Sequence, residues 1–247
     1  MNTPYYEDDA VTLYLGDMRE TLPALGLQAD LIVADPPYAV TKLPWDHWPH
    51  GWPEVAATVA SSMWCFGSTR MFLDYRDEFA AWTLSQDVIW EKPEGVGFTN
   101  DRFRRVHEVA LHWYQGPWKQ QHKATPRDGI PTPARRGRGS SVAKGIYDGM
   151  PGVPYVDDGT RLMRSVIKVR NLHSRNIHPT EKPLGILTPL IEYACPEGGL
   201  VVDPFAGSGS TLDAARQSGR RAIGIEAHEP YAEAAARRLS QLTLEAS

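Results

Sequence analysis

The chain has 247 residues, of which 42% are hydrophobic and 23% are charged, and its formal net charge is −4. This length suffices to bury one substantial core, and the composition is that of a globular protein. No apolar run approaches the roughly 18 residues that a membrane-spanning helix needs, and the acidic N-terminus lacks the apolar stretch of a secretion signal. We therefore expect a cytoplasmic protein with no membrane partner. Two cysteines, Cys65 and Cys195, exclude a disulfide framework and lack metal-ligand spacing, so no metal is expected.

The charges are segregated along the chain. Residues 115–175 hold twelve Lys/Arg and four Asp/Glu, a net charge of +8, so the rest of the chain carries −12. Such asymmetry is typical of an insertion that meets nucleic-acid phosphates, and a solvated basic loop is the alternative. Residues 116–178 are also rich in Pro, Gly and Ser, and long irregular segments inside a compact domain are functional or disordered. We expect one domain, 1–247, with a basic insertion at 115–177.

Hydrophobic periodicity predicts alternating strands and helices in the rest of the chain. The expected strands are 11–15, 30–34, 63–66, 87–90, 108–113, 199–203 and 221–225, and the expected helices are 18–25, 53–62, 76–84, 183–194, 212–218 and 230–242. Continuous apolar runs such as 30–34 are typical of strands buried in a parallel sheet. The pattern favours an α/β fold of the Rossmann-like kind, in which ligands bind at the carboxyl ends of the strands.

A strand, a Gly-x-Gly loop, a helix, a second strand and an acid follow one another near the C-terminus, which predicts a nucleotide-binding unit. Gly207 and Gly209 allow the backbone to approach a ligand, and Glu226, nineteen positions after Gly207, can hold ribose hydroxyls. Leu212 stands where a dinucleotide fingerprint has its third glycine, which disfavours a pyrophosphate. Asp203 beside the loop suits a cationic amino-acid moiety better than a phosphate. A purely structural βα turn is the alternative.

The sequence Asp35-Pro36-Pro37-Tyr38 at the end of a predicted strand is the most specific feature of the chain. An exocyclic base amine is a poor nucleophile because its lone pair is delocalised into the ring. If Asp35 and the Pro36 carbonyl accept the two N–H bonds, the lone pair points toward a methyl donor and the developing charge is stabilised. Tyr38 would stack on the base.

With these two motifs the sequence resembles the amino-group DNA methyltransferases, which make N6-methyladenine or N4-methylcytosine. It is similar to their permuted group, in which the catalytic motif precedes the cofactor motif. The resemblance covers nearly the whole chain outside 115–177, where the family has its target-recognition region. It implies a seven-stranded, mostly parallel sheet, S-adenosylmethionine as cofactor, and double-stranded DNA with a flipped target base as substrate. Further matching segments are Trp45-Asp46, Trp90-x-Lys92-Pro93, His107-Glu108 and His178 to Pro183.

The motifs and the resemblance assign site residues in three groups. The catalytic residues are Asp35, Pro36, Pro37 and Tyr38. The cofactor-binding residues are Asp17, Lys182, Asp203, Phe205, Ala206, Gly207, Ser208, Gly209, Ser210, Thr211 and Glu226. The DNA-binding residues are Trp45, Arg135, Arg136 and Arg138.

Some of these residues have an ordinary structural alternative. Asp17 can end a strand or cap the following helix. Trp45, Trp48 and Trp52 can be core or lid aromatics instead of contacts to an extruded base. Cys65 lies in an apolar strand and is expected in the core, not as a nucleophile.

Adenine N6 is the expected acceptor, because the family's adenine enzymes usually have Asp at the first motif position and its cytosine enzymes more often have Ser. N4-cytosine methylation is the alternative. An RNA or protein-amide methyltransferase is disfavoured by the basic insertion, and a non-catalytic nucleic-acid binder is disfavoured by the two intact motifs. The resemblance also raises a homodimer and a cognate restriction endonuclease as partners.

Overall fold

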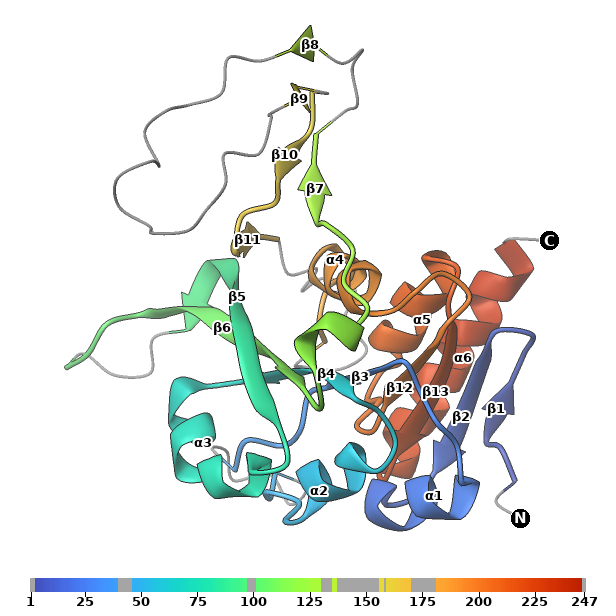
Figure 1. Cartoon of the computed structure of the whole chain (residues 1–247). Helices are drawn as coiled ribbons and strands as arrows, with labels where there is room; N and C mark the ends of the chain where they lie inside the picture. The colour runs from blue at the N-terminus through green and yellow to red at the C-terminus, as the bar shows by residue number, and fades with distance from the viewer. Residues whose placement is uncertain are drawn as a thin grey trace. The chain divides into compact units, whose positions relative to one another are not determined.

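The computed structural model is shown in Figure 1. Within the described residues the chain forms two compact units, one comprising Met1–Ala124 with Ser165–Ser247 and the other comprising Thr125–Arg164. No helix in the described part of the chain is long and apolar enough to cross a membrane. The structure describes residues 3–39, 46–96, 101–129, 135–136, 156–157, 159–169 and 181–245.

A mixed sheet is the framework of the first unit. Among the described residues it has nine strands in the order β1-β2-β13-β12-β3-β4-β6-β5-β11. Neighbours from β2 to β4 are parallel, and β6 runs antiparallel to both β4 and β5. The predicted seven strands form its interior, and the short edge strands β1 and β11 extend it. The strands are β1 Tyr6–Glu7, β2 Val11–Leu15, β3 Leu31–Ala34, β4 Ser62–Gly67, β5 Thr83–Val96, β6 Arg105–Tyr114, β11 Val166–Lys168, β12 Leu200–Asp203 and β13 Arg221–Glu226.

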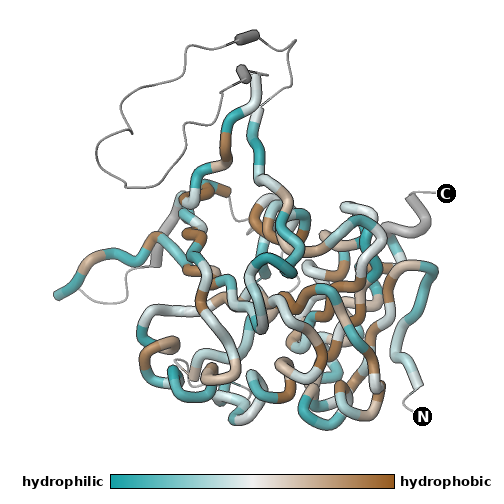
Figure 2. The backbone as a smooth tube through the Cα atoms, in the orientation of Figure 1, coloured by the Kyte–Doolittle hydropathy of each residue, from teal (hydrophilic) through white to brown (hydrophobic). Residues whose placement is uncertain are grey.

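Helices cover both faces of the sheet because its strands are apolar on both sides. In β3, Leu31 and Val33 belong to the core packed by α4, α5 and α6, whereas Ile32 and Ala34 belong to the core packed by α1, α2 and η1. Figure 2 shows apolar residues recurring along the central strands and the helices. The helices are α1 Met18–Leu25, α2 Trp52–Ala57, α3 Thr69–Asp74, η1 Arg76–Phe79, η2 Trp118–Gln120, α4 Leu184–Ala194, α5 Ser210–Gln217 and α6 Glu229–Glu245.

The strands that carry the two predicted motifs are direct neighbours. β12 pairs with β3 in parallel, with Val201 opposite Leu31 and Val202 opposite Ile32, and β13 flanks β12 on its other side. Because parallel neighbours end at the same edge of a sheet, the turn after β3 and the loop after β12 emerge side by side.

Two predicted helices differ in the structure, and one strand appears where none was predicted. The helix expected at 53–62 ends at Ala57. The helix expected at 76–84 is wrong beyond the short 3₁₀ turn η1, because β5 begins at Thr83 and pairs with β6 along its length. Strand β11, inside the stretch expected to be irregular, adds to the sheet edge by pairing with β5.

The second unit lies within the basic insertion predicted at 115–177. Its strand β7 Arg127–Asp128 pairs antiparallel with β10 Arg161–Leu162, and β8 Arg135–Arg136 pairs with β9 Val156–Asp157. The Arg127 guanidinium donates a 2.8 Å hydrogen bond to the Thr160 hydroxyl. The unit spans fewer residues than the insertion predicted at 115–177, since η2 and β11 belong to the first unit.

Candidate active site

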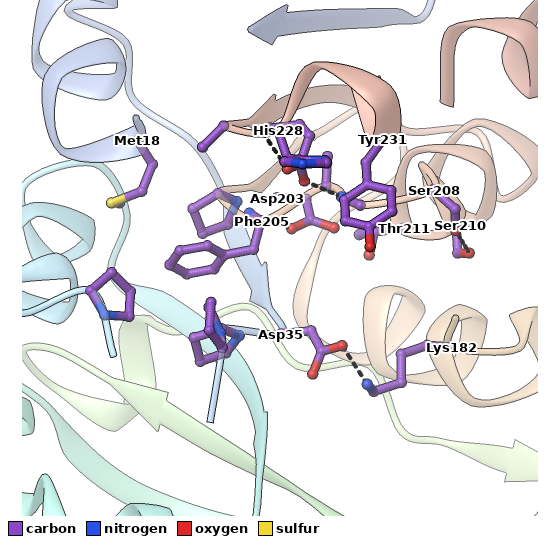
Figure 3. A pocket seen from close by; sticks show the side chains of 18 of the residues that line it. Met18, Asp35, Lys182, Asp203, Phe205, Ser208, Ser210, Thr211, His228 and Tyr231 are labelled. Atoms are coloured by element: carbon purple, nitrogen blue, oxygen red, sulfur yellow. Dashed lines mark hydrogen bonds and ion pairs between the residues drawn. The ribbon is translucent and has the colours of Figure 1, made fainter. Parts of the chain in front are cut away.

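A cavity of about 300 Å³ lies in the first unit at the carboxyl ends of β3, β12 and β13 (Figure 3). It is lined by every predicted catalytic and cofactor-binding residue except Gly209. The structure thus brings the Asp35 turn and the Asp203 loop into one site. The lining residues to which sequence reasoning gave no site role are Gly16, Met18, Asp46, Pro49, Glu108, Glu181, Pro204, Ala227, His228 and Tyr231.

The catalytic turn follows β3 directly and is held by its own side chains. The Tyr38 hydroxyl donates a 2.7 Å hydrogen bond to Oδ1 of Asp35. Burial raises the pKa of Tyr38 well above its usual value, so this hydroxyl keeps its proton and donates. Ala39 follows in a left-handed conformation with φ 54°, and its N–H donates a 2.8 Å bond to Oδ1 of the buried Asp46. Asp46 therefore fixes the exit of the turn.

Lys182 contacts the catalytic carboxylate directly. Its Nζ pairs with Oδ2 of Asp35 and lies 3.3 Å from Oε2 of Glu108. Burial disfavours the charged amine, but Asp35 and Glu108 outweigh it and raise the pKa of Lys182. The predicted cofactor-binding residue Lys182 does line the cavity, yet its ion pairs go to the catalytic turn and to β6.

Glu226 at the end of β13 secures the glycine loop. Its Oε2 accepts a 2.8 Å hydrogen bond from the Gly207 N–H, and its Oε1 accepts one of 2.8 Å from the His228 N–H. Burial raises the pKa of Glu226. Gly207 has φ 52°, a conformation that favours glycine. The loop therefore keeps its shape before any ligand arrives.

Asp203 ends β12 beneath the same loop. Its Oδ1 accepts a 2.9 Å bond from the Phe205 N–H, and burial together with the charges of Asp35 and Glu226 raises its pKa to about 7. In the described part of the chain, neither Asp203 nor Glu226 forms a salt bridge with a lysine or arginine. Asp203 is buried and Glu226 is half-buried, so a positively charged ligand beside them would offset the cost of withdrawing their charges from water.

Asp17 and Gly209 have structural roles. Asp17 caps α1 by accepting a 2.9 Å bond from the Arg19 N–H, and it also lines the cavity, so the structural alternative for this residue is confirmed without removing it from the site. Gly209 does not line the cavity, and its assignment to the cofactor stays a prediction. It precedes α5 with φ 76° and packs against Ala235 of α6.

The aromatic residues near the catalytic turn belong to the core where the structure describes them. Trp48 stacks on Tyr75 at 4.1 Å between ring centroids, and Trp52 is fully buried with its ring edge-on to Phe205 at 5.3 Å. Trp52 therefore supports the Phe205 wall of the cavity. Cys65 is buried, as expected for a core residue.

The DNA-binding residues predicted from the sequence lie mostly beyond what the structure describes. Trp45 and Arg138 lie outside the described residues. Arg135 and Arg136 form strand β8 in the second unit, where only their backbone is described.

The model of the DNA methylase family N6_N4_Mtase matches residues 29–237. This chain belongs to the N6/N4 DNA methylase family. The resemblance to the amino-group DNA methyltransferases is thereby confirmed, and the methylase is a DNA methyltransferase of the adenine-N6 or cytosine-N4 kind, whereas its place in the permuted group stays a prediction.

Individual relatives agree with this family. The methylase is 26% identical to the type II methyltransferase M.ScaI of Streptomyces caespitosus over 97% of this chain and 84% of that protein. It is 59% identical to the putative methylase YubD of Escherichia coli K12, over only 26% of this chain and 28% of that protein.

Solved structures share the fold of the methylase. The M1.HpyAVI–SAM complex has a TM-score of 0.63 and 22% identity, with coverage of 93% of this chain and 99% of that one. The cytosine-N4-specific PvuII DNA methyltransferase has a TM-score of 0.64 and 18% identity, with coverage of 96% and 89%.

Proposed function

We propose that this methylase transfers a methyl group from S-adenosylmethionine to the N6 amine of adenine at a specific short site in double-stranded DNA. The observation that carries the proposal is the shared cavity, in which the Asp35 turn and the acidic glycine loop meet at adjacent strand ends. One segment is suited to polarise an aromatic amine and the other to hold a cationic donor, and the reaction needs both in one place.

The residues of the cavity fit S-adenosylmethionine. Asp203 and Glu226 offer negative charge to a ligand that carries a sulfonium and an ammonium, while Met18, Pro204 and Phe205 provide apolar walls for its adenine ring. When bound, this cofactor supplies a methyl group on a positively charged sulfur, which is open to attack by a lone pair. The M1.HpyAVI–SAM complex, of the same fold, supports this assignment.

The catalytic turn supplies the acceptors for the target amine. Asp35 and the Pro36 carbonyl accept its two N–H bonds, which directs the nitrogen lone pair into the cavity. The prolines contribute carbonyls without competing N–H donors and stiffen the turn. The Tyr38 ring stacks on the base that has left the duplex.

The acceptor base and the DNA contacts are inferred from the sequence. Asp35 at the first motif position favours adenine, following the family's usual pattern. The basic insertion at 115–177, with Arg135, Arg136 and Arg138, supplies phosphate contacts and reads the target site. The similarity to M.ScaI, a type II methyltransferase, supports a site-specific modification role. The homodimer and the cognate endonuclease stay predictions.

Nucleoside analysis tests the proposal. The purified full-length chain is incubated with S-adenosylmethionine and unmethylated duplex DNA of random sequence, and the DNA is digested and analysed by mass spectrometry. We expect N6-methyladenine, and its loss with the Asp35→Ala variant. N4-methylcytosine alone would replace the adenine assignment. Methyl incorporation into RNA but not DNA would defeat the DNA assignment, and full activity of Asp35→Ala would defeat the catalytic one.

A further inference from the structure

A chain of alternating charges runs behind the catalytic carboxylate. Oδ2 of Asp35 pairs with Lys182, Lys182 lies 3.3 Å from Oε2 of Glu108, and Oε1 of Glu108 pairs with Lys92. Each residue comes from a different element, namely the end of β3, the residue before the α4 cap at Pro183, strand β6 and strand β5. This row of ion pairs therefore ties the catalytic turn to strands β5 and β6 and to the segment before α4.

These four side chains are withdrawn from water. The exposed fraction of the side chain is 6% for Lys182, 16% for Glu108, 21% for Lys92 and 24% for Asp35. Lys182 also lies over the Phe66 ring at 5.3 Å from the centroid. Burying a lysine is costly unless its charge is met, and removing one member of a buried ion pair leaves the other uncompensated. Loss of Lys182 would therefore leave the catalytic carboxylate of Asp35 without the cation that it pairs with.

We propose that Lys182 and Glu108 are positioning residues for methyl transfer. Lys182 fixes Oδ2 of Asp35, so that the carboxylate presents Oδ1 to the acceptor amine, and Glu108 fixes Lys182 with Lys92 behind it. This inference rests on the proposed function, because it concerns the same carboxylate.

Glu108 has an electrostatic task as well as a geometric one. The amine becomes positively charged as the methyl group arrives, and the charge of Asp35 stabilises it. Lys182 alone would cancel that charge, but Lys182 is shared between Asp35 and Glu108, and with Lys92 behind Glu108 the four residues carry a net charge of zero. The pKa of Glu108 agrees with this role, since burial raises it but the neighbouring Lys182 and Lys92 bring it below its usual value. Glu108 therefore competes with Asp35 for the charge of Lys182, while Lys182 orients the Asp35 carboxylate.

The competing role for Lys182 is direct contact with the cofactor, as the sequence predicted. The two roles differ in the quantity they affect. A cofactor contact appears in the dissociation constant of S-adenosylmethionine, whereas a positioning residue appears in kcat with that constant unchanged.

The test compares Lys182→Met, Lys182→Arg, Glu108→Gln and the double variant Lys182→Met/Glu108→Gln with the wild type. Calorimetry gives the cofactor dissociation constant, and methyl transfer to DNA gives kcat and KM. Misplacement of a catalytic group by about 1 Å costs on the order of 100-fold, so Lys182→Met is expected to lose about that much kcat with cofactor binding within twofold of wild type. Lys182→Arg should recover part of the loss, and thermal melting confirms that each variant is folded.

The double variant reports whether the residues act as one unit. If Glu108 works through Lys182, the double variant is no slower than Lys182→Met alone, whereas independent roles multiply the two losses. Glu233→Gln, which removes an exposed carboxylate paired with Arg237 on α6, is the matched control and should behave as wild type.

The outcomes separate the two proposals. A wild type that methylates no DNA base overturns the proposed function and this inference with it. Two results would overturn the positioning role alone, provided that the wild type is active. One is a Lys182→Met variant as active as the wild type, and the other is a Lys182→Met variant that loses cofactor affinity tenfold at unchanged kcat.

Discussion

The Tyr38 hydroxyl donates a 2.7 Å hydrogen bond to Oδ1 of Asp35, while Lys182 pairs with Oδ2 of the same carboxylate. Each carboxylate oxygen has two acceptor positions, so Oδ1 retains one for an incoming amine. The two residues of one four-residue motif thus hold each other, and Tyr38 combines an orienting hydroxyl with a ring suited to stack on a base.

Substitution of Tyr38 separates these two contributions. Tyr38→Phe keeps the ring and removes a hydrogen bond, and should lower kcat about three- to tenfold, in line with roughly 0.5–1.5 kcal/mol for such a bond. Tyr38→Ala also removes the stacking surface, which is worth roughly 1–3 kcal/mol per base, and should lower kcat further. Both should bind S-adenosylmethionine as the wild type does. Steady-state kinetics and calorimetry make the measurements.

The control for this pair is Tyr5→Phe, because Tyr5 is exposed and does not line the cavity. An equal loss of cofactor affinity in Tyr38→Ala would contradict the placement of its ring against the acceptor base.

The sequence predicted the elements whose signal is local. The runs 30–34 and 199–203 are apolar because both faces of β3 and β12 are buried, and each run ends at a motif with its own chemistry. Parallel pairing then places both motifs in one site, which is why the motif residues of the cavity lining could be predicted, whereas ten other lining residues were not.

Long-range pairings could not be predicted in this way. Lys182 lies 147 positions from Asp35, and no periodicity in either segment reports their contact. The helix predicted at 76–84 is wrong for a similar reason. Strand β5 begins within this stretch and pairs with β6, and this long-range pairing overrides the local helical pattern. For Asp46, the sequence offered only its position beside Trp45 in a matching segment. Its hydrogen bond from the Ala39 N–H forms only once the turn is folded, so the sequence could not predict it.

Asp203 should make the stability of the methylase depend on pH. The pKa of its carboxyl is about 7 in the folded state, against an ordinary value of 3.8, so between about pH 4 and 7 the folded state holds a proton that the unfolded chain has released. The contribution of Asp203 to stability therefore falls as the pH rises through this range, by up to a few kcal/mol. Relative to wild type, Asp203→Asn should gain stability at pH 8 and little at pH 4, as measured by urea unfolding.

The matched control is Asp74→Asn, since Asp74 is exposed on α3 and should show no such pH-dependent gain. S-adenosylmethionine should reduce the difference at pH 8, because a cationic ligand stabilises the ionised form of Asp203. Equal pH profiles for wild type and Asp203→Asn would show that Asp203 is not the titrating group.

The glycines of the cofactor loop should respond differently to alanine. Gly207, Gly209 and Gly26 all have positive φ, of 52°, 76° and 59°, so each alanine variant should lose about 1–2 kcal/mol of stability from backbone strain. Gly209→Ala should lose more stability, because its new Cβ would lie 3.3 Å from the Cβ of Ala235.

Gly207→Ala should also weaken cofactor binding, since Gly207 lines the cavity. Gly26→Ala is the control, at the end of α1 with no atom within 4 Å of the new Cβ. Thermal melting and calorimetry distinguish the three, and cofactor affinity unchanged in Gly207→Ala would place the ligand away from the loop.

Replacing Arg135, Arg136 and Arg138 by alanine should weaken DNA binding and flatten its dependence on salt. Each phosphate contact contributes roughly 0.9 to the slope of log affinity against log salt concentration, so loss of all three should reduce the slope by nearly three. The DNA affinity is measured by fluorescence anisotropy of a labelled duplex between about 50 and 300 mM salt, a range in which such slopes are steep. A charge-matched control removes three exposed arginines of the first unit, Arg70, Arg76 and Arg237. Because both triple variants change the net charge equally, a slope that falls alike in the two reflects overall charge, and only a selective fall with the insertion variant locates the phosphate contacts there.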